Sequence, residues 1–136
     1  MVLAPAYGGS RRGTGSGPRC RDVPEPLAQF PAHAAPSAIV AYRSPGFPSH
    51  YEGGLFVAFH GSLFRAPLAP SGYAVMFIPR RSDGTFGTPE RFASASLTRR
   101  VLRARMRPSG LAVGPDGSLF VSDDAAGRVW RIRARR

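Results

Sequence analysis

The side chains in this chain that could do chemistry are three histidines, one cysteine, two adjacent aspartates and 19 basic residues, all of them arginine. Apart from the arginines, these are His33, His50, His60, Cys20, Asp123 and Asp124. Arginine suits an anionic ligand, because its planar donors meet a carboxylate in two parallel hydrogen bonds. A histidine near pH 7 is a neutral donor and acceptor that can bond a carbonyl oxygen. The arginines and histidines are therefore the side chains to consider for ligand binding.

The spacing of these residues argues against a metal site or a nucleophilic site. The histidines are far apart, and the chain has no HExxH motif and no acidic calcium loop. Asp123 and Asp124 end an expected strand, so their side chains should point to opposite faces, and we favour a turn-capping role for both. Cys20 has no cysteine partner and no histidine nearby, which indicates a bystander thiol. His50 is expected to be structural or exposed.

Short apolar strands must position these groups. Two apolar runs, LAV at 111–113 and SLFVS at 118–122, are separated by Pro115-Asp116-Gly117, a tight-turn sequence. A second turn at 125–127 leads into a further strand at 129–132. Earlier strands are expected at 37–42, 54–60, 73–78 and 89–92, with a turn at 82–84. No helix of three turns is predicted.

Three segments carry a resemblance to a known family. They are HAAPSAIVAY at 33–42, YEGGLFVAFHGS at 51–62 and RPSGLAVGPDGSLFVSDDAAGRVWRI at 107–132. Together they resemble the C-terminal part of the pyrroloquinoline quinone (PQQ)-dependent sugar dehydrogenases, closest to the L-sorbosone dehydrogenase-like branch. That resemblance implies part of a six-bladed β-propeller that oxidises a sugar or aldehyde with bound PQQ and calcium. The resembled family consists of quinoprotein oxidoreductases of carbohydrate metabolism.

The predicted fold class is all-β: a partial β-propeller of about two blades of antiparallel strands, with an irregular N-terminal segment. A blade needs about 40 to 50 residues, so residues 33–136 have room for about two. Residues 1–32 are predicted to be irregular or disordered, because 8–31 are dense in Gly, Pro, Ser and Arg without periodicity. Two blades cannot close a ring. The exposed strand edges therefore predict self-association or pairing with missing blades.

The resemblance also implies roles for individual residues in binding the cofactor. Arg107 matches an arginine that grips PQQ, and Ser109 stands where some relatives carry a second arginine. His33 matches a polar residue at the mouth of a blade strand, and His60 has roughly the position of a cofactor-contacting lysine. The alternative is that all three candidates, His33, His60 and Arg107, are solvated surface residues. No catalytic residue is assigned, because the family's proton acceptor and calcium ligands belong to blades absent from this chain. The isolated chain is expected to turn over little or nothing.

The formal net charge of +11 invites a nucleic-acid interpretation. Composition weakens that interpretation, because the chain has no lysine or asparagine and no nucleic-acid-binding motif accompanies the arginines. The arginine-rich stretch 99–107 is either a short basic helix or, as we favour, a solvated loop. A second function class stays open: a non-enzymatic propeller remnant whose edges and basic surface bind a protein or polyanion.

No signal peptide or membrane span is predicted at the start of the chain, which has only a brief apolar stretch and no charged leader. The resembling family works in the periplasm or outside the cell. The localisation of this chain is therefore left open. The sugar substrate is not identified, because the walls of its pocket are expected mostly from blades absent from this chain.

Overall fold

The structure, a computed structural model, describes residues 26–62, 71–94 and 105–135, and every structural statement below concerns those residues. They form antiparallel strands with one short 3-10 helix. The elements are β1 (Pro36–Ala41), η1 (Ser49–Tyr51), β2 (Leu55–Phe59), β3 (Ala74–Ile78), β4 (Glu90–Ser94), β5 (Pro108–Val113), β6 (Leu119–Asp123) and β7 (Arg128–Ile132). Every strand lies where the sequence pattern predicts one. Among the described residues no helix is long and apolar enough to cross a membrane.

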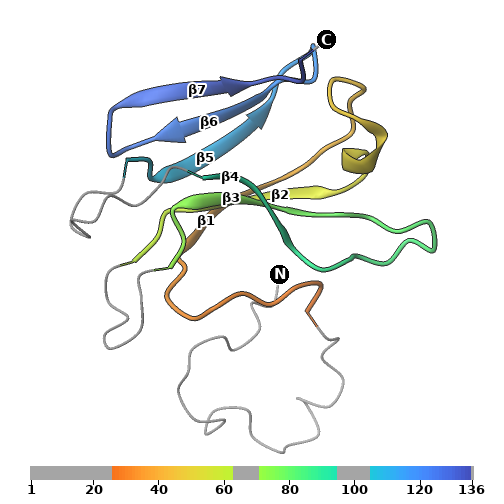
Figure 1. The fold of residues 1–136 in the computed structure, drawn as a ribbon, viewed down its shortest axis with the longest axis horizontal. Coiled ribbons are helices and arrows are strands. Elements are labelled where there is room, and N and C mark those ends of the chain that lie inside the picture. The colour runs from red at the N-terminus through yellow and green to blue at the C-terminus, as the bar shows by residue number, and fades with distance from the viewer. Residues whose placement is uncertain (1–25, 63–70, 95–104, 136) are drawn as a thin grey trace, which may run out of the picture.

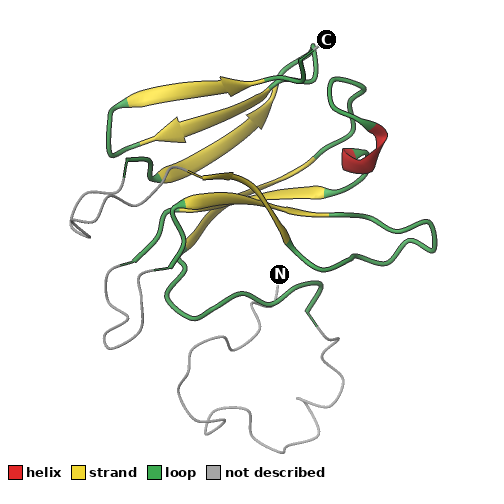
Figure 2. Cartoon of the chain, viewed as in Figure 1, coloured by secondary structure: helices red, strands yellow, loops and turns green. Residues whose placement is uncertain are grey.

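The strands form two separate antiparallel sheets. The first has the order β1-β2-β3-β4 and the second the order β5-β6-β7, so each strand lies beside its neighbour in the chain. Figure 1 shows the two sheets as layers, and Figure 2 shows how little of the chain is helical. The predicted fold class, all-β with about two blades of antiparallel strands, is confirmed.

The main hydrophobic core lies between the two sheets. Successive residues of a strand point to opposite faces, so Phe56 and Phe77 face the second sheet while Val57 and Ile78 face away from it. From the second sheet, Leu119 enters the same core and is fully buried. The cluster comprises Tyr42, Phe47, Phe56, Val75, Phe77, Met106, Leu119 and Val121. Removing this apolar surface from water is what holds the two sheets together.

The outer face of the first sheet is covered by the segment that precedes β1. Phe30 packs on Phe59 with ring centroids 4.6 Å apart, and Ala28 contacts the same cluster. Figure 1 shows this segment, in orange, on the side of the sheet away from β5–β7. The described part of the predicted irregular segment therefore covers apolar surface. The predicted boundary between an N-terminal segment and the strand region, at residues 32 and 33, stays a prediction. Cys20 and residues 99–104 of the arginine-rich stretch lie outside the described residues.

Tyr42 joins the two sheets at one end. Its side chain is fully buried, and its hydroxyl donates to the Gly117 carbonyl at 2.8 Å while accepting the Phe47 N–H at 2.8 Å. Gly117 belongs to the β5–β6 turn and has φ +77°. A Cβ added there would lie 2.5 Å from the Cα of Gly46, so the two backbones touch. The sheets can approach this closely only because both residues are glycine.

The β5–β6 turn is further fixed by Asp116. Its carboxylate accepts the Ser118 hydroxyl at 2.7 Å and the Ser118 N–H at 3.2 Å, and it pairs with Arg131 on β7. These contacts, the Ser118 hydroxyl first and Arg131 next, lower the pKa of Asp116 from 3.8 to about 2. The predicted Pro-Asp-Gly turn is therefore held by its own side chains.

Comparison of two glycine substitutions tests the contact between the sheets. Gly117 and Gly127 both have positive φ, +77° and +58°, but a Cβ at Gly127 meets nothing within 4 Å. Gly127→Ala should cost about 1 kcal/mol of unfolding free energy, from backbone strain alone. Gly117→Ala adds a collision with Gly46 and should cost about 3 kcal/mol or more. Urea unfolding measures both, and equal losses would contradict the close approach.

Candidate functional site

Three polar side chains meet where the two sheets lie side by side, at the end opposite to Tyr42. His60 directly follows β2, Arg107 directly precedes β5 and Asp124 directly follows β6. Antiparallel pairing brings the end of one strand beside the start of its partner, so these three positions share one end of the structure. The site therefore contains residues from both sheets.

The three side chains form a closed network. His60 Nε2 lies 2.8 Å from Asp124 Oδ2, and Arg107 Nη2 lies 3.5 Å from His60 Nδ1. Arg107 Nε also lies 3.6 Å from Asp124 Oδ1. Because a carboxylate only accepts and a guanidinium only donates, the network requires Nε2–H as the donor and Nδ1 as the acceptor. Both ring nitrogens of His60 are therefore engaged within the chain.

The network faces solvent and retains binding capacity. The side chains of His60, Arg107 and Asp124 are 25%, 44% and 48% exposed. Exposed ion pairs contribute little to stability, so the network is poorly explained as a stabilising device. Arg107 uses Nε and Nη2 in these contacts, which leaves N–H donors that can meet an incoming oxygen. The arrangement presents an oriented arginine at the boundary between the sheets.

The backbone of Arg107 is fixed by a buried carboxylate. Asp123, only 1% exposed, accepts the Arg107 N–H at 3.0 Å. The same side chain accepts the Ala125 N–H at 3.2 Å and the Trp130 indole N–H at 3.1 Å. One carboxylate thus joins the start of β5, the turn after β6 and the middle of β7.

Two opposed influences act on the pKa of Asp123. Burial raises it, because a charged carboxylate loses hydration inside the protein. The N–H groups of Arg107, Trp130 and Ala125 and the charge of Arg128 lower it by a larger combined amount. The net result is a pKa below the ordinary value of 3.8. Asp123 is therefore a buried anion at neutral pH, with each of its hydrogen bonds assisted by charge.

A second connection joins the sheets beside Arg107. Ser37 on β1 has its hydroxyl 3.0 Å from the Pro108 carbonyl on β5 and 3.3 Å from the Ala58 carbonyl on β2. The Ser109 hydroxyl on β5 lies 3.0 Å from the Ser122 hydroxyl on β6.

Backbone strain gathers at the same end of the first sheet. Among the described residues, the non-glycine residues with positive φ are His33, Ala35 and Tyr73, at 60°, 56° and 55°. Ala35 accepts the His60 N–H at 2.9 Å, and Tyr73 precedes β3 beside the end of β2. Such conformations cost free energy and cluster at functional sites. Their position here supports this end of the structure as the functional one.

The predicted site residues are placed as follows. His60 and Arg107 are in direct contact. His33 is exposed and lies at the same end, because the two residues after it, Ala34 and Ala35, accept the backbone N–H groups of Gly61 and His60. Their contact with a cofactor stays a prediction. His50 is about half exposed and bonds Glu90 at 2.9 Å, away from this network. Asp124 is a site residue that was not predicted from the sequence. Its side chain was, however, expected to point opposite to that of Asp123, and in the structure it contacts His60.

Comparison with known proteins agrees with this architecture. The family model described as TrAA12-like matches residues 8–135. The chain belongs to the TrAA12-like family. Two solved structures have the same fold: a calcium structure and an iodide structure of the Trichoderma reesei carbohydrate-active enzyme of family AA12. Their TM-scores are 0.63 and 0.60, with 23% and 24% identity.

This family assignment corrects one prediction. The resemblance to the L-sorbosone dehydrogenase-like branch of PQQ-dependent sugar dehydrogenases is wrong, because the family match and the solved neighbours are of the AA12 type. The quoted segments are strand-turn-strand sequences of the kind that any such pair of sheets requires. They located the strands correctly but did not distinguish between families that share the strand pattern.

The chain corresponds to only part of its larger relatives. It covers 29% of each AA12 structure, while 90% of this chain is matched. An uncharacterized protein of Borreliella burgdorferi is 29% identical over 106 residues, which is 78% of this chain and 27% of that protein. The chain therefore spans less than a third of the length of each of these relatives.

The buried carboxylate predicts an acid-sensitive stability. Because the folded pKa of Asp123 lies below 3.8, its contribution is complete above about pH 5 and is lost as pH falls through the folded pKa. Asp123→Asn should cost roughly 2 kcal/mol at pH 7 and flatten the decline in unfolding free energy below pH 5. Glu52→Gln, at an exposed loop position, is the control and should change stability far less. An unchanged acid profile in Asp123→Asn would show that this carboxylate is not the anchor.

Proposed function

We propose that this chain forms part of a carbohydrate-active oxidoreductase of the AA12 type and contributes one edge of its cofactor site. The observation that supports this best is the solvent-facing network of Arg107, His60 and Asp124, built from both sheets and anchored from behind by Asp123. Membership of the TrAA12-like family supports the proposed class of protein, and the position of the network supports the proposed cofactor edge. The substrate on this proposal is a sugar or aldehyde.

The cofactor proposed for this edge is PQQ, and the chemistry of the residues present fits it. PQQ carries carboxylates and carbonyls, and the donor edge of an arginine bonds a carboxylate in a planar, charge-assisted way. Asp124 keeps the Arg107 guanidinium oriented at 3.6 Å through Nε and leaves its other donors available. When bound, PQQ supplies the acceptor for the electrons of the oxidised sugar.

The residues of this chain bind and orient, and none of them is proposed to abstract the substrate proton. A general base needs a free lone pair within hydrogen-bond reach of the proton that it takes. His60 donates from Nε2 to Asp124 and accepts at Nδ1 from Arg107, so neither nitrogen is available in this arrangement. His60 is therefore a positioning residue for Arg107. The base is proposed to come from other parts of the complete enzyme.

Calcium is proposed to bind outside the described part of this chain. Calcium takes six to eight oxygen ligands, several of them from carboxylates. Among the described residues no group of three or more His, Cys, Asp or Glu side chains lies close enough to hold a metal. The cofactor contact and the metal contact then come from different segments of one enzyme.

The β7 edge of the second sheet is proposed to meet the remainder of that enzyme. Within the described strands, β7 pairs with β6 alone, whereas β3 at the corresponding place in the first sheet also pairs with β4. Val129 on β7 is 66% exposed. An exposed edge with unpaired N–H and C=O groups readily accepts another strand. Completion of the site by further segments explains why the isolated chain should bind PQQ weakly and turn over little or nothing.

Arg107→Gln tests the proposed cofactor edge. PQQ added to the ¹⁵N-labelled chain should shift the backbone amides of His60, Arg107 and Ser109 in a saturable way. Arg107→Gln should weaken that binding about tenfold, because it removes a charge-assisted bond to a carboxylate. Arg105→Gln removes the same charge from the same segment and should leave the affinity within about twofold.

Two results would contradict this function. In the first, PQQ at the highest concentration that stays in solution causes no shift at these amides in a folded chain. In the second, PQQ binds equally well to Arg107→Gln. Salt-sensitive binding of a polyanion such as heparin, together with no response to PQQ, would favour the non-enzymatic interaction module instead.

A further inference from the structure

A cavity of about 410 Å³ opens at the other end of the first sheet. It is lined by Arg43, Glu52, Gly53, Arg80, Arg81 and Ser82. These residues come from the loop after β1, the loop before β2 and the loop after β3, so they share the end at which β1 and β3 finish. A five-residue strand is about 17 Å long, which separates this cavity from the His60 end. The cavity and the proposed cofactor edge are therefore at opposite ends of the first sheet.

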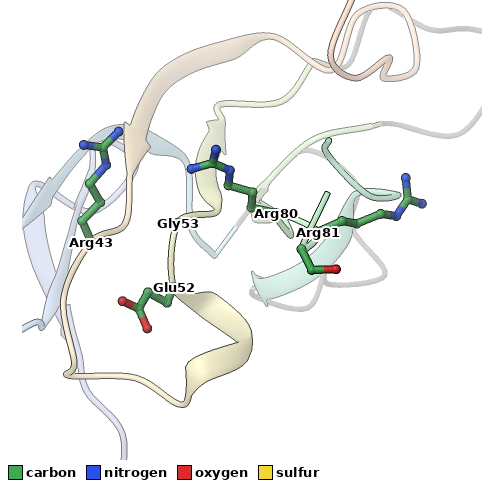
Figure 3. A pocket seen from close by; sticks show the side chains of 6 residues that line it. Arg43, Glu52, Gly53, Arg80 and Arg81 are labelled. Atoms are coloured by element: carbon green, nitrogen blue, oxygen red, sulfur yellow. The ribbon is translucent and has the colours of Figure 1, made fainter. Parts of the chain in front are cut away.

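The cavity has an excess of positive charge. It contains three guanidinium groups and one carboxylate, that of Glu52. Neither Arg43 nor Arg80 forms an ion pair with a described residue, whereas Arg81 donates from Nη1 to the Phe86 carbonyl at 3.1 Å. Figure 3 shows the guanidinium groups of Arg43 and Arg80 directed to the same side, with Arg81 turned away. Two cations thus face one opening, and neither has a counterion among the residues that the structure describes.

The backbone holds these two arginines in place. Gly53 donates its N–H to the Tyr42 carbonyl at 2.8 Å, which ties the loop before β2 to the residue preceding Arg43. Gly53 has φ +74°, and a Cβ there would lie 3.3 Å from Cδ of Arg80. The stem of Arg80 therefore lies across a position that only glycine fills without strain. The next residue, Arg81, bonds its N–H to the Thr85 carbonyl at 2.8 Å.

We propose that this cavity binds a small polyhydroxylated anion: a molecule of sugar size that carries a carboxylate or a phosphate. Arg43 and Arg80 bind the oxyanion, because guanidinium groups recognise carboxylate and phosphate oxygens through parallel hydrogen bonds. Glu52 accepts hydrogen bonds from ligand hydroxyls, and the Ser82 hydroxyl can donate or accept. A carboxylate that lines the same cavity as the arginines disfavours a bare anion and favours one with hydroxyl groups, which sets the ligand class.

Titration of the full ¹⁵N-labelled chain with gluconate, glucose 6-phosphate, inorganic phosphate and glucose tests this site. Gluconate or glucose 6-phosphate should cause saturable shifts at the amides of Gly53, Arg80 and Ser82, and neutral glucose should not. The stronger of the two anions identifies a carboxylate or a phosphate as the recognised group. Raising the salt concentration should weaken binding, since the site is exposed.

Four variants make the test specific. Arg43→Gln and Arg80→Gln should each weaken anion binding about tenfold. Arg91→Gln removes the same charge from exposed β4, outside the cavity, and should leave affinity within about twofold. Glu52→Gln should tighten inorganic phosphate and reduce the preference for polyol anions over it, because the repelling carboxylate is removed.

Several results would overturn the proposal. They are the absence of saturable shifts for both polyol anions, equal binding of glucose, or equal loss of affinity in Arg91→Gln and Arg80→Gln. An unchanged preference in Glu52→Gln would remove the hydroxyl contact, and with it the assigned ligand class. The positions of the core amides in the same spectra establish that each variant is folded.

Discussion

The proposed functional end of the structure, where His60, Arg107 and Asp124 meet, depends on the hydrogen bonds that the Asp123 carboxylate accepts. It is a buried anion that accepts N–H groups from the start of β5, from the turn after β6 and from Trp130 on β7. Leaving it without partners would be costly, because an unpaired buried charge loses its hydration without compensation. The three segments are therefore held together, and Arg107 is held with its side chain beside His60 and Asp124.

The two ends of the structure join the sheets in different ways. At one end, Tyr42 and the Gly46–Gly117 contact bring the backbones together through a buried hydroxyl and two residues without side chains. At the other end, polar side chains cross between the sheets, and several residues adopt strained backbone conformations. A tight apolar junction at one end leaves the other end available for charged groups that face solvent. This division explains how a chain of modest size holds a polar network without losing its core.

Alternation of apolar residues and the turn residues predicted every strand, because those signals act over a few neighbouring residues. The site could be predicted only in part. Asp124 meets His60 across the gap between two sheets, and nothing local in the sequence states how those sheets are placed. Arg43 and Arg80 are likewise brought to one opening by the sheet topology alone. The family prediction failed for a related reason: strand and turn sequences report the backbone pattern, and the side chains that distinguish families lie outside it.

Amide hydrogen exchange at Arg107 tests the central role of Asp123 most directly. In the parent chain the Arg107 amide and the Trp130 indole should be protected, because both donate to the buried carboxylate. In Asp123→Ala both should exchange at least about tenfold faster, while the amides of Val75 and Phe77 in central β3 keep their protection. If Arg107 and Trp130 stay protected in a folded Asp123→Ala variant, the carboxylate does not organise this end of the structure.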